Sequence, residues 1–152
     1  MALPGCGGSG SADEPLTTIK ATVKAPEISL PPGSPPRRLI VRDLRPGSGA
    51  GIPPRREIAI KANYTSISYR TKKLYEVKWS REGSFVIPFG PKLEVEGWEK
   101  GLIGMKAGGR RELRVPSRMA YDEGAIVYLI DLLDWKPITS RAQAYNWKNE
   151  SG

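Results

Sequence analysis

The sequence predicts an α+β domain in which a curved antiparallel β-sheet wraps around one short α-helix. Two observations within residues 37–135 lead to this prediction. Several segments alternate apolar and polar residues with a period of two, which is typical of strands that bury one face. A single segment, 95–105, instead repeats its apolar residues at helical spacing. A sheet and one amphipathic helix are stable together when each buries its apolar face against the other.

Six segments of this domain have the composition and period of strands. Two turn-forming runs separate the first two predicted strands: 46–49, which contains proline and glycine, and 53–56, which contains two prolines. The last segment is strongly apolar. In chain order, the predicted strands are Leu39–Leu44, Glu57–Ser66, Lys73–Tyr75, Ser84–Ile87, Arg110–Val115 and Ala125–Leu133.

The one predicted helix lies between the fourth and fifth strands. Its apolar residues are Val95, Trp98, Leu102 and Met105. Their spacing of three, four and three residues places them on one face of a helix. Glycines at 108 and 109 follow, and glycine readily adopts the left-handed conformation that ends a helix. We therefore expect a helix over 95–105 that packs against the sheet.

The two ends of the chain differ in composition from the domain. Residues 1–36 contain five glycines and seven prolines without a sustained apolar period, so they are predicted to form a disordered arm. Residues 136–152 are predicted to form a tail with a fraying helix over Arg141–Lys148. Tyr145 and Trp147 in this tail are expected to pack back onto the domain. The predicted organisation is an arm (1–36), a domain (37–135) and a tail (136–152).

The arm contains the single cysteine of the chain, Cys6. The run Leu3-Pro4-Gly5-Cys6 and the glycine-rich and serine-rich tether after it are similar to a bacterial lipobox. Such a motif follows an apolar leader of roughly 7–15 residues. The match therefore implies a start upstream and a lipid-anchored, extracytoplasmic protein. The alternative is a chance match, with Cys6 a free cysteine in a cytoplasmic protein. No stretch reaches the ~18 apolar residues of a membrane span, so attachment to a membrane would require a covalently bound lipid.

The composition excludes several kinds of catalytic site. The 152 residues include no histidine, which excludes a Ser-His-Asp triad, a Cys-His pair and a histidine zinc site. A single cysteine excludes an internal disulfide and a Cys-x-x-Cys metal or redox motif. Neither a metal nor an organic cofactor is predicted.

The chain is basic, with 24 Lys and Arg against 16 Asp and Glu and a net charge of +8. Paired basic residues at 37–38, 55–56, 72–73 and 110–111 are scattered through the domain and are not interleaved with aromatic residues. A nucleic-acid partner is therefore not predicted. A basic surface of this kind more often serves solubility, or attracts anionic lipid headgroups weakly.

The strongest motif is the segment 95–111, which reads VEGWEKGLIGMKAGGRR. It resembles the V-I-x-G-W-E-x-G-L-x-G-M-x-x-G-x-x-R segment of the FKBP family of peptidyl-prolyl isomerases. Upstream, residues 63–66 are similar to the family's H-Y-x-G, and residues 75–85 to its F-D-S-S-x-x-x-x-x-P-F. The run 126–133 is similar to the closing strand of the family. The resemblance covers essentially all of 37–135 and implies the FKBP-like fold, with its sheet curved around the helix.

The resemblance also implies a pocket for a proline ring. It puts Trp98 at the floor, and it puts the walls at Tyr64, Tyr75, Phe85 and Tyr128, with Val95 beside them. The backbone N–H of Val95 would donate to a substrate carbonyl. The Tyr121 hydroxyl would donate to another carbonyl from the rim. Glu76 stands where the family has an aspartate, and it could orient tyrosine hydroxyls.

The implied reaction is rotation about an X–Pro amide, whose barrier is roughly 18–20 kcal/mol because resonance gives the C–N bond double-bond character. This resonance is charge-separated, so a dry apolar pocket weakens it. No proton moves, and a chain without histidine is compatible with the reaction. The implied partners are proline-containing polypeptides, and the implied role is to assist protein folding. A monomer is the simplest expectation.

The chain departs from the family after Tyr121. Only Asp122–Ala125 separate it from the closing run 126–133, where the family usually has a loop of aliphatic residues over the pocket. We expect a more open site, weaker substrate binding, less preference at the residue before proline and weak binding of macrolide inhibitors. Three hypotheses follow, in this order: an active isomerase, a non-catalytic module that binds proline-containing segments, and a binder of nucleic acid or anionic surfaces.

Overall fold

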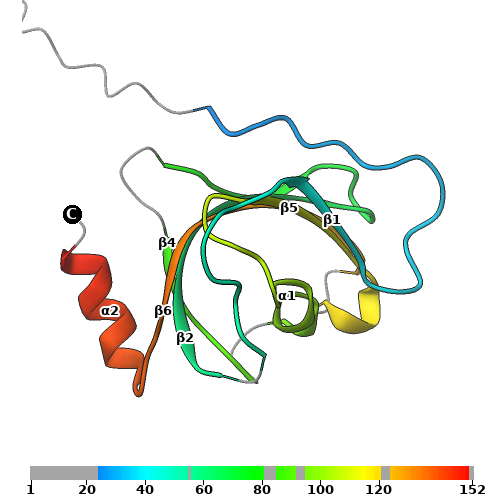
Figure 1. Ribbon diagram of the computed structural model, residues 1–152. Coiled ribbons are helices and arrows are strands. Elements are labelled where there is room, and N and C mark those ends of the chain that lie inside the picture. Colours follow the sequence, from blue (N-terminus) through cyan, green and yellow to red (C-terminus); the bar gives the residue numbers. More distant parts are fainter. Residues whose placement is uncertain (1–23, 55, 81–84, 92–94, 121–123, 151–152) are drawn as a thin grey trace, which may run out of the picture.

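The computed structural model describes residues 24–54, 56–80, 85–91, 95–120 and 124–150. Six strands form one antiparallel sheet in the order β1-β5-β6-β2-β3, and β4 pairs with β2 beyond the end of β3. The sheet curves around the helix α1, as Figure 1 shows, so the predicted α+β fold is confirmed. The strands are β1 (Ile40–Arg45), β2 (Ile58–Ser68), β3 (Leu74–Lys78), β4 (Phe85–Phe89), β5 (Arg110–Val115) and β6 (Ile126–Pro137).

The two long strands β2 and β6 form the centre of the sheet and pair along their whole length. Alternate residues of β6 enter the core on the concave face: Ile126, Tyr128, Ile130 and Leu132. β6 continues four residues beyond its predicted end at Leu133, since Ile58 still pairs with Pro137. The sequence signal stopped early because Leu133 and Asp134 are exposed and the strand is no longer apolar there.

The helix α1 (Glu96–Gly101) lies in the concave face of the sheet. It approaches β5 closely because its two glycines face that strand. A Cβ added to Gly101 would lie 2.7 Å from the Leu113 side chain, and one added to Gly97 would collide with Val115. Only hydrogen atoms in place of side chains allow this approach. The small faces of Gly97 and Gly101 therefore set the distance between helix and sheet.

The helix is shorter than the predicted 95–105. It ends at Gly101. Gly104 has a positive φ of 76°, which is incompatible with a right-handed α-helix. The backbone instead turns to meet an outer segment, because Gly104 N–H donates to the Ile52 carbonyl (2.8 Å) and Ile52 N–H donates to the Met105 carbonyl (3.0 Å). Leu102 and Met105 are nevertheless buried, as their apolar spacing predicted.

Arg111 of β5 ties three parts of the fold together from a buried position. Its side chain donates to the carboxylate of Asp43 on β1 at 2.7 and 3.2 Å. The same guanidinium donates to the carbonyls of Gly101 (2.9 Å) and Ile103 (3.1 Å) at the end of α1. The last carbonyls of a helix have no partner within it, and here an arginine from the sheet supplies one.

The convex face of the sheet is covered at two places. Residues 24–36 have no regular secondary structure, but Ile28 and Leu30 pack against a small cluster that includes Ile67 and Val127. This part of the predicted arm therefore lies on the sheet. Figure 1 shows the segment running along the outside of the sheet.

The helix α2 (Arg141–Glu150) covers the other end of the convex face. Its Trp147 packs with Ala59. The ammonium groups of Lys61 and Lys136 lie over the Trp147 ring, at 4.1 and 4.8 Å from its centroid. Trp147 thus packs back onto the domain as expected, whereas Tyr145 points outward with 57% of its surface exposed. Neither α1 nor α2, the two α-helices in the described part of the chain, is long and apolar enough to cross a membrane.

The contact between α1 and β5 leads to a stability prediction. Gly97→Ala should lower the free energy of unfolding by about 1–3 kcal/mol, because the added methyl group overfills the gap to Val115. Chemical denaturation measures this. Glu96→Ala is the matched control, since Glu96 is exposed and a solvent-exposed ion pair such as that with Lys100 contributes little to stability. A Gly97→Ala variant as stable as the control would contradict the close packing.

Candidate active site

A pocket of about 310 Å³ opens next to α1 on the concave side of the sheet. Side chains from β2, β3, β4, α1 and β6 contribute to its wall, so it draws on elements far apart in the sequence. Six of the residues that the sequence analysis put at the site meet here, together with one that it did not name. The lining residues are Tyr64, Tyr75, Glu76, Ile87, Val95, Trp98 and Tyr128.

Three aromatic rings form the apolar base of this pocket. Trp98 is 3% exposed and makes edge-to-face contacts with two tyrosines. Its ring centroid lies 4.9 Å from that of Tyr64 and 5.5 Å from that of Tyr128, with interplanar angles of 81° and 86°. Edge-to-face packing at these distances is favourable for aromatic rings. The rings therefore hold one another in place without a ligand.

The backbone explains why these rings meet. The period of two along β2 and β6 turns Tyr64 and Tyr128 to the concave side, where α1 lies. Gly97 brings the adjacent Trp98 against the sheet. The indole N–H of Trp98 is buried, and no side chain or backbone group in the described part of the chain accepts from it. The base of the pocket therefore consists of aromatic rings that are largely shielded from solvent.

Val95 lies just ahead of α1 and borders the pocket. It is 6% exposed, and its carbonyl accepts from the N–H groups of Trp98 (2.8 Å) and Glu99 (3.1 Å), which begins the helix. Its extended backbone, with φ −57° and ψ 137°, marks the helix boundary. The donation from its N–H to a substrate stays a prediction.

The rim comes from the edge strand β3. Its pairing with β2 shifts register between Ser66 and Ile67, opposite Tyr75, and Tyr75 is 43% exposed at the mouth of the pocket. The next residue, Glu76, is half-buried and is fixed to β2 by its backbone. Its N–H donates to Ser66 Oγ at 3.1 Å, and its carbonyl accepts from Thr65 Oγ1 at 3.2 Å. The orientation of tyrosine hydroxyls by Glu76 stays a prediction.

Phe85 is not among the residues that line the pocket. It lies at the start of β4 opposite Ala62, with the Lys78 ammonium 5.7 Å from its ring centroid. Ile87, two residues further on the same face of the strand, lines the pocket instead. The sequence analysis chose Phe85 because an aromatic residue matched the family pattern. The period of two in 85–89 was the signal that could have pointed to Ile87 as well.

Two candidate residues, Tyr121 and Cys6, lie outside the described residues. In the described part of the chain, no three His, Cys, Asp or Glu side chains are grouped in a way that could hold a metal ion. The lining offers apolar rings, one carboxylate and tyrosine hydroxyls. This arrangement suits the binding of a small apolar ring and the removal of water from a neighbouring amide.

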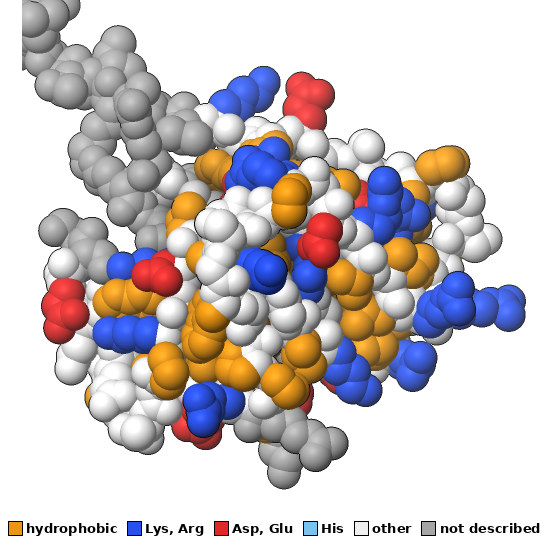
Figure 2. Space-filling view, in the orientation of Figure 1, with side chains coloured by type: hydrophobic (Ala, Val, Ile, Leu, Met, Phe, Trp, Pro, Cys, Tyr) orange, Lys and Arg blue, Asp and Glu red, His pale blue; other side chains and the backbone are white. Residues whose placement is uncertain are grey.

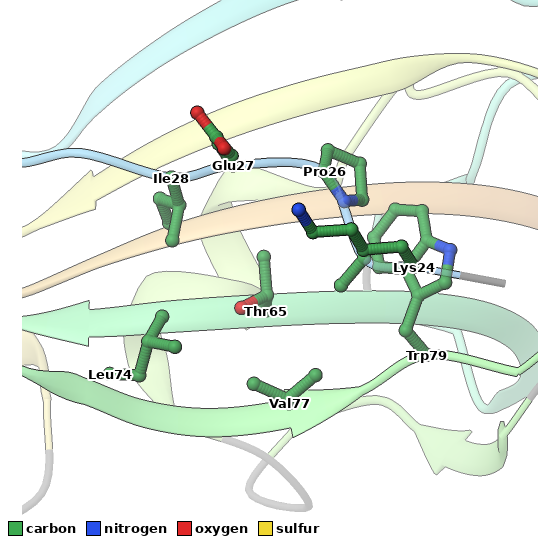
Figure 3. Close-up of a pocket in the computed structure, with 9 residues that line it drawn as sticks. Lys24, Pro26, Glu27, Ile28, Thr65, Leu74, Val77 and Trp79 are labelled. Atoms are coloured by element: carbon green, nitrogen blue, oxygen red, sulfur yellow. The ribbon is translucent and has the colours of Figure 1, made fainter. Parts of the chain in front are cut away.

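A larger groove of about 530 Å³ lies on the opposite, convex face (Figure 3). One wall is the segment with Lys24, Pro26 and Ile28, and the other side is formed by residues of β2, β3 and the residue after β3: Thr65, Leu74, Val77 and Trp79. It has no base of stacked rings. Volume alone would favour this groove, but the aromatic geometry favours the concave pocket as the candidate active site.

The family model and the relatives that match this chain point to the same family. A model of the FKBP-type peptidyl-prolyl cis-trans isomerase family matches residues 52–135. The chain is similar to an FK506-binding protein of Streptomyces anulatus, at 31% identity over 105 residues, which are 68% of this chain and 83% of that protein. It is also similar to a probable FK506-binding protein of Corynebacterium glutamicum, at 32% identity over 120 residues, 73% of this chain and 98% of that protein.

One solved structure supports the fold. The chain matches FkpA from Escherichia coli with a TM-score of 0.53 and 24% sequence identity. The match covers 65% of this chain and 48% of that one, so it spans about half of the longer protein.

The first turn of α1, next to the pocket, leads to a pH prediction. Lys100 donates to the Glu96 carboxylate at 2.6 Å, and this hydrogen bond and its charge lower the pKa of Glu96 below the usual value. The ion pair thus contributes to stability above the usual glutamate pKa, and this contribution is lost as the pH falls through the lowered pKa. Lys100→Met should raise the pKa of Glu96 in a carboxyl NMR titration. Lys148→Met, on α2, is the control, and an equal effect of both would contradict the assignment.

Proposed function

The chain belongs to the FKBP-type peptidyl-prolyl cis-trans isomerase family, and we propose that it accelerates X–Pro rotation by holding the proline ring on Trp98 in the concave pocket. The observation that carries this mechanism is the buried indole ring between Tyr64 and Tyr128. The substrates are proline-containing polypeptides, and the role is to assist their folding.

The physical argument concerns the amide, not a protein nucleophile. Resonance makes the ground-state amide planar and polar, and water stabilises that polarity. The rotating amide loses resonance in the transition state, so a site without water raises the ground state relative to the transition state. The base of this pocket is apolar and shielded from solvent, because Trp98 is 3% exposed and is bordered by the rings of Tyr64 and Tyr128. The Val95 N–H is proposed to hold a neighbouring substrate carbonyl while the bond turns.

A non-catalytic binding module is the second candidate, and one observation favours it. Tyr75 at the mouth is 43% exposed, and in the sequence only four residues, 122–125, separate Tyr121 from β6. A pocket that stays open to water would bind a proline ring but weaken the resonance of its amide less. The exchange measurement below separates the two candidates.

Several properties of the whole protein stay proposals. We propose a monomer that is lipid-anchored through Cys6 outside the cytoplasm, with a cytoplasmic protein as the alternative. Nucleic acid is not a proposed partner. Lysine and arginine side chains are spread across the face drawn in Figure 2, with acidic side chains among them.

The first functional prediction concerns the base of the pocket. Trp98→Leu should lower kcat/KM for cis–trans exchange of an X–Pro peptide, followed by NMR, by roughly tenfold or more, about 1.4 kcal/mol for each tenfold. Trp79→Leu is the control, since Trp79 lines the convex groove instead. Circular dichroism verifies that both variants fold. Equal loss in the two variants would contradict the site, and binding without accelerated exchange in the wild type would favour the binding module.

The second functional prediction concerns the hydroxyl of Tyr128. If the pocket works by excluding water, Tyr128→Phe should keep kcat/KM within about twofold of the wild type or raise it, because the ring and its contact with Trp98 remain. The same NMR exchange measurement tests this. A tenfold loss would mean that the hydroxyl itself takes part in the reaction.

A further inference from the structure

We propose that the hydroxyl groups of Thr65 and Ser66 are positioning groups for the active site. Together they hold a one-residue bulge of β3 that brings both Tyr75 and Glu76 to the pocket. The inference rests on the proposed function, because it concerns the same site. Neither Thr65 nor Ser66 is among the residues that line the pocket, so both would act through β3.

The pairing of β2 with β3 contains one extra residue on β3. Ser66 lies opposite Glu76. The next residue of β2, Ile67, lies opposite Leu74, one position further along β3 than a regular ladder would place it. Tyr75 is therefore the extra residue. An insertion of this kind is a β-bulge, which bends the strand and can turn a side chain in a new direction.

The bulge changes which side chains of β3 face the pocket. In a regular strand, successive side chains point to opposite faces of the sheet. Tyr75 and Glu76 are successive, yet both line the concave pocket. Their neighbours Leu74 and Val77 both line the groove on the convex face (Figure 3). Without the extra residue, Tyr75 and Glu76 could not both face the pocket.

Two hydroxyl groups of β2 hold the bulge at Glu76. The Glu76 N–H donates to Ser66 Oγ at 3.1 Å, and the Thr65 hydroxyl donates to the Glu76 carbonyl at 3.2 Å. Both β2 residues are buried, with exposed fractions of 0% for Ser66 and 1% for Thr65. Removing a buried hydrogen-bond partner destabilises the arrangement that the bond holds. Loss of either hydroxyl should therefore loosen the bulge.

The Ser66 hydroxyl is a feature of this chain. The family motif that residues 63–66 resemble has glycine at its last position, and glycine has no side chain that could accept a hydrogen bond. Thr65 lies on the opposite face of β2, where it lines the convex groove. Its effect on the pocket would pass through the backbone of Glu76. Thr65 is therefore the more informative residue to change.

The place of Tyr75 and Glu76 determines which kinetic constant the bulge affects. Both border the mouth of the pocket, whereas Trp98 forms its base. A bound peptide would contact the mouth before and during the rotation of its amide. Loss of contacts that are equal in both states raises KM and leaves kcat nearly unchanged. Partial unfolding would instead lower the concentration of active protein, and hence the apparent kcat, without changing KM.

The experiment follows cis–trans exchange of an X–Pro peptide by NMR over a range of peptide concentrations, with the full chain and its variants. Thr65→Val removes the hydroxyl but keeps the branched shape of the side chain. It should raise KM roughly fivefold, which corresponds to one hydrogen bond, and keep kcat within about twofold of the wild type. Ser66→Ala should have the same effect.

Two further variants serve as controls. Thr65→Ser keeps the hydroxyl and should hold KM within about twofold of the wild type. Thr71→Val makes the same chemical change in the same hairpin but away from the bulge, since Thr71 Oγ1 accepts from the Lys73 N–H at 3.3 Å. It should leave both kinetic constants near their wild-type values.

An unchanged KM in Thr65→Val and Ser66→Ala, or a lower kcat at unchanged KM, would overturn the proposal. A rise in KM that Thr65→Ser shares would overturn it as well. If the wild type accelerates no peptide, the proposed isomerase function fails instead. Amide hydrogen exchange then tests the positioning by itself. The Glu76 N–H should exchange faster in Thr65→Val and Ser66→Ala than in the wild type and Thr71→Val, and equal exchange in all four proteins would contradict it.

Discussion

The close approach of α1 to β5 is the constraint on which the rest of the structure depends. Gly97 and Gly101 face Val115 and Leu113, where side chains would not fit. This approach places Trp98 within edge-to-face contact of Tyr64 and Tyr128. A helix held further from the sheet would leave a gap under the ring and admit water. The shielded aromatic base of the pocket is therefore a consequence of backbone packing.

The sheet reinforces this arrangement from the other end of the helix. Arg111 binds the last carbonyl of α1, the Ile103 carbonyl just after the helix and the carboxylate of Asp43, so helix, β5 and β1 share one buried group. The base of the pocket is thus built on paired strands and a short helix, and such elements position side chains more tightly than loops do. The rim is different, since it comes from an edge strand whose Tyr75 is 43% exposed.

The sequence predicted the parts of the fold that follow from periodicity and from a long motif. The strand order along the chain, the helix around Trp98 and most of the pocket lining came from these signals. The end of β6 was missed because residues near it are exposed. The end of the helix was missed because Met105 continues the apolar spacing, although Gly104 just before it has a positive φ. Ile87 was missed because the motif offered an aromatic residue two positions earlier. The packing of Ile28 and Leu30 on the convex face depends on distant residues that no local pattern reveals.

The most direct test of the account is where a proline ring binds, because pockets lie on both faces of the sheet. Intermolecular nuclear Overhauser effects between the proline ring protons of a bound peptide and the tryptophan ring protons of the protein give the answer. The account predicts contacts to Trp98, accompanied by contacts to Tyr64 and Tyr128. Contacts to Trp79 in the convex groove, with none to Trp98, would contradict it.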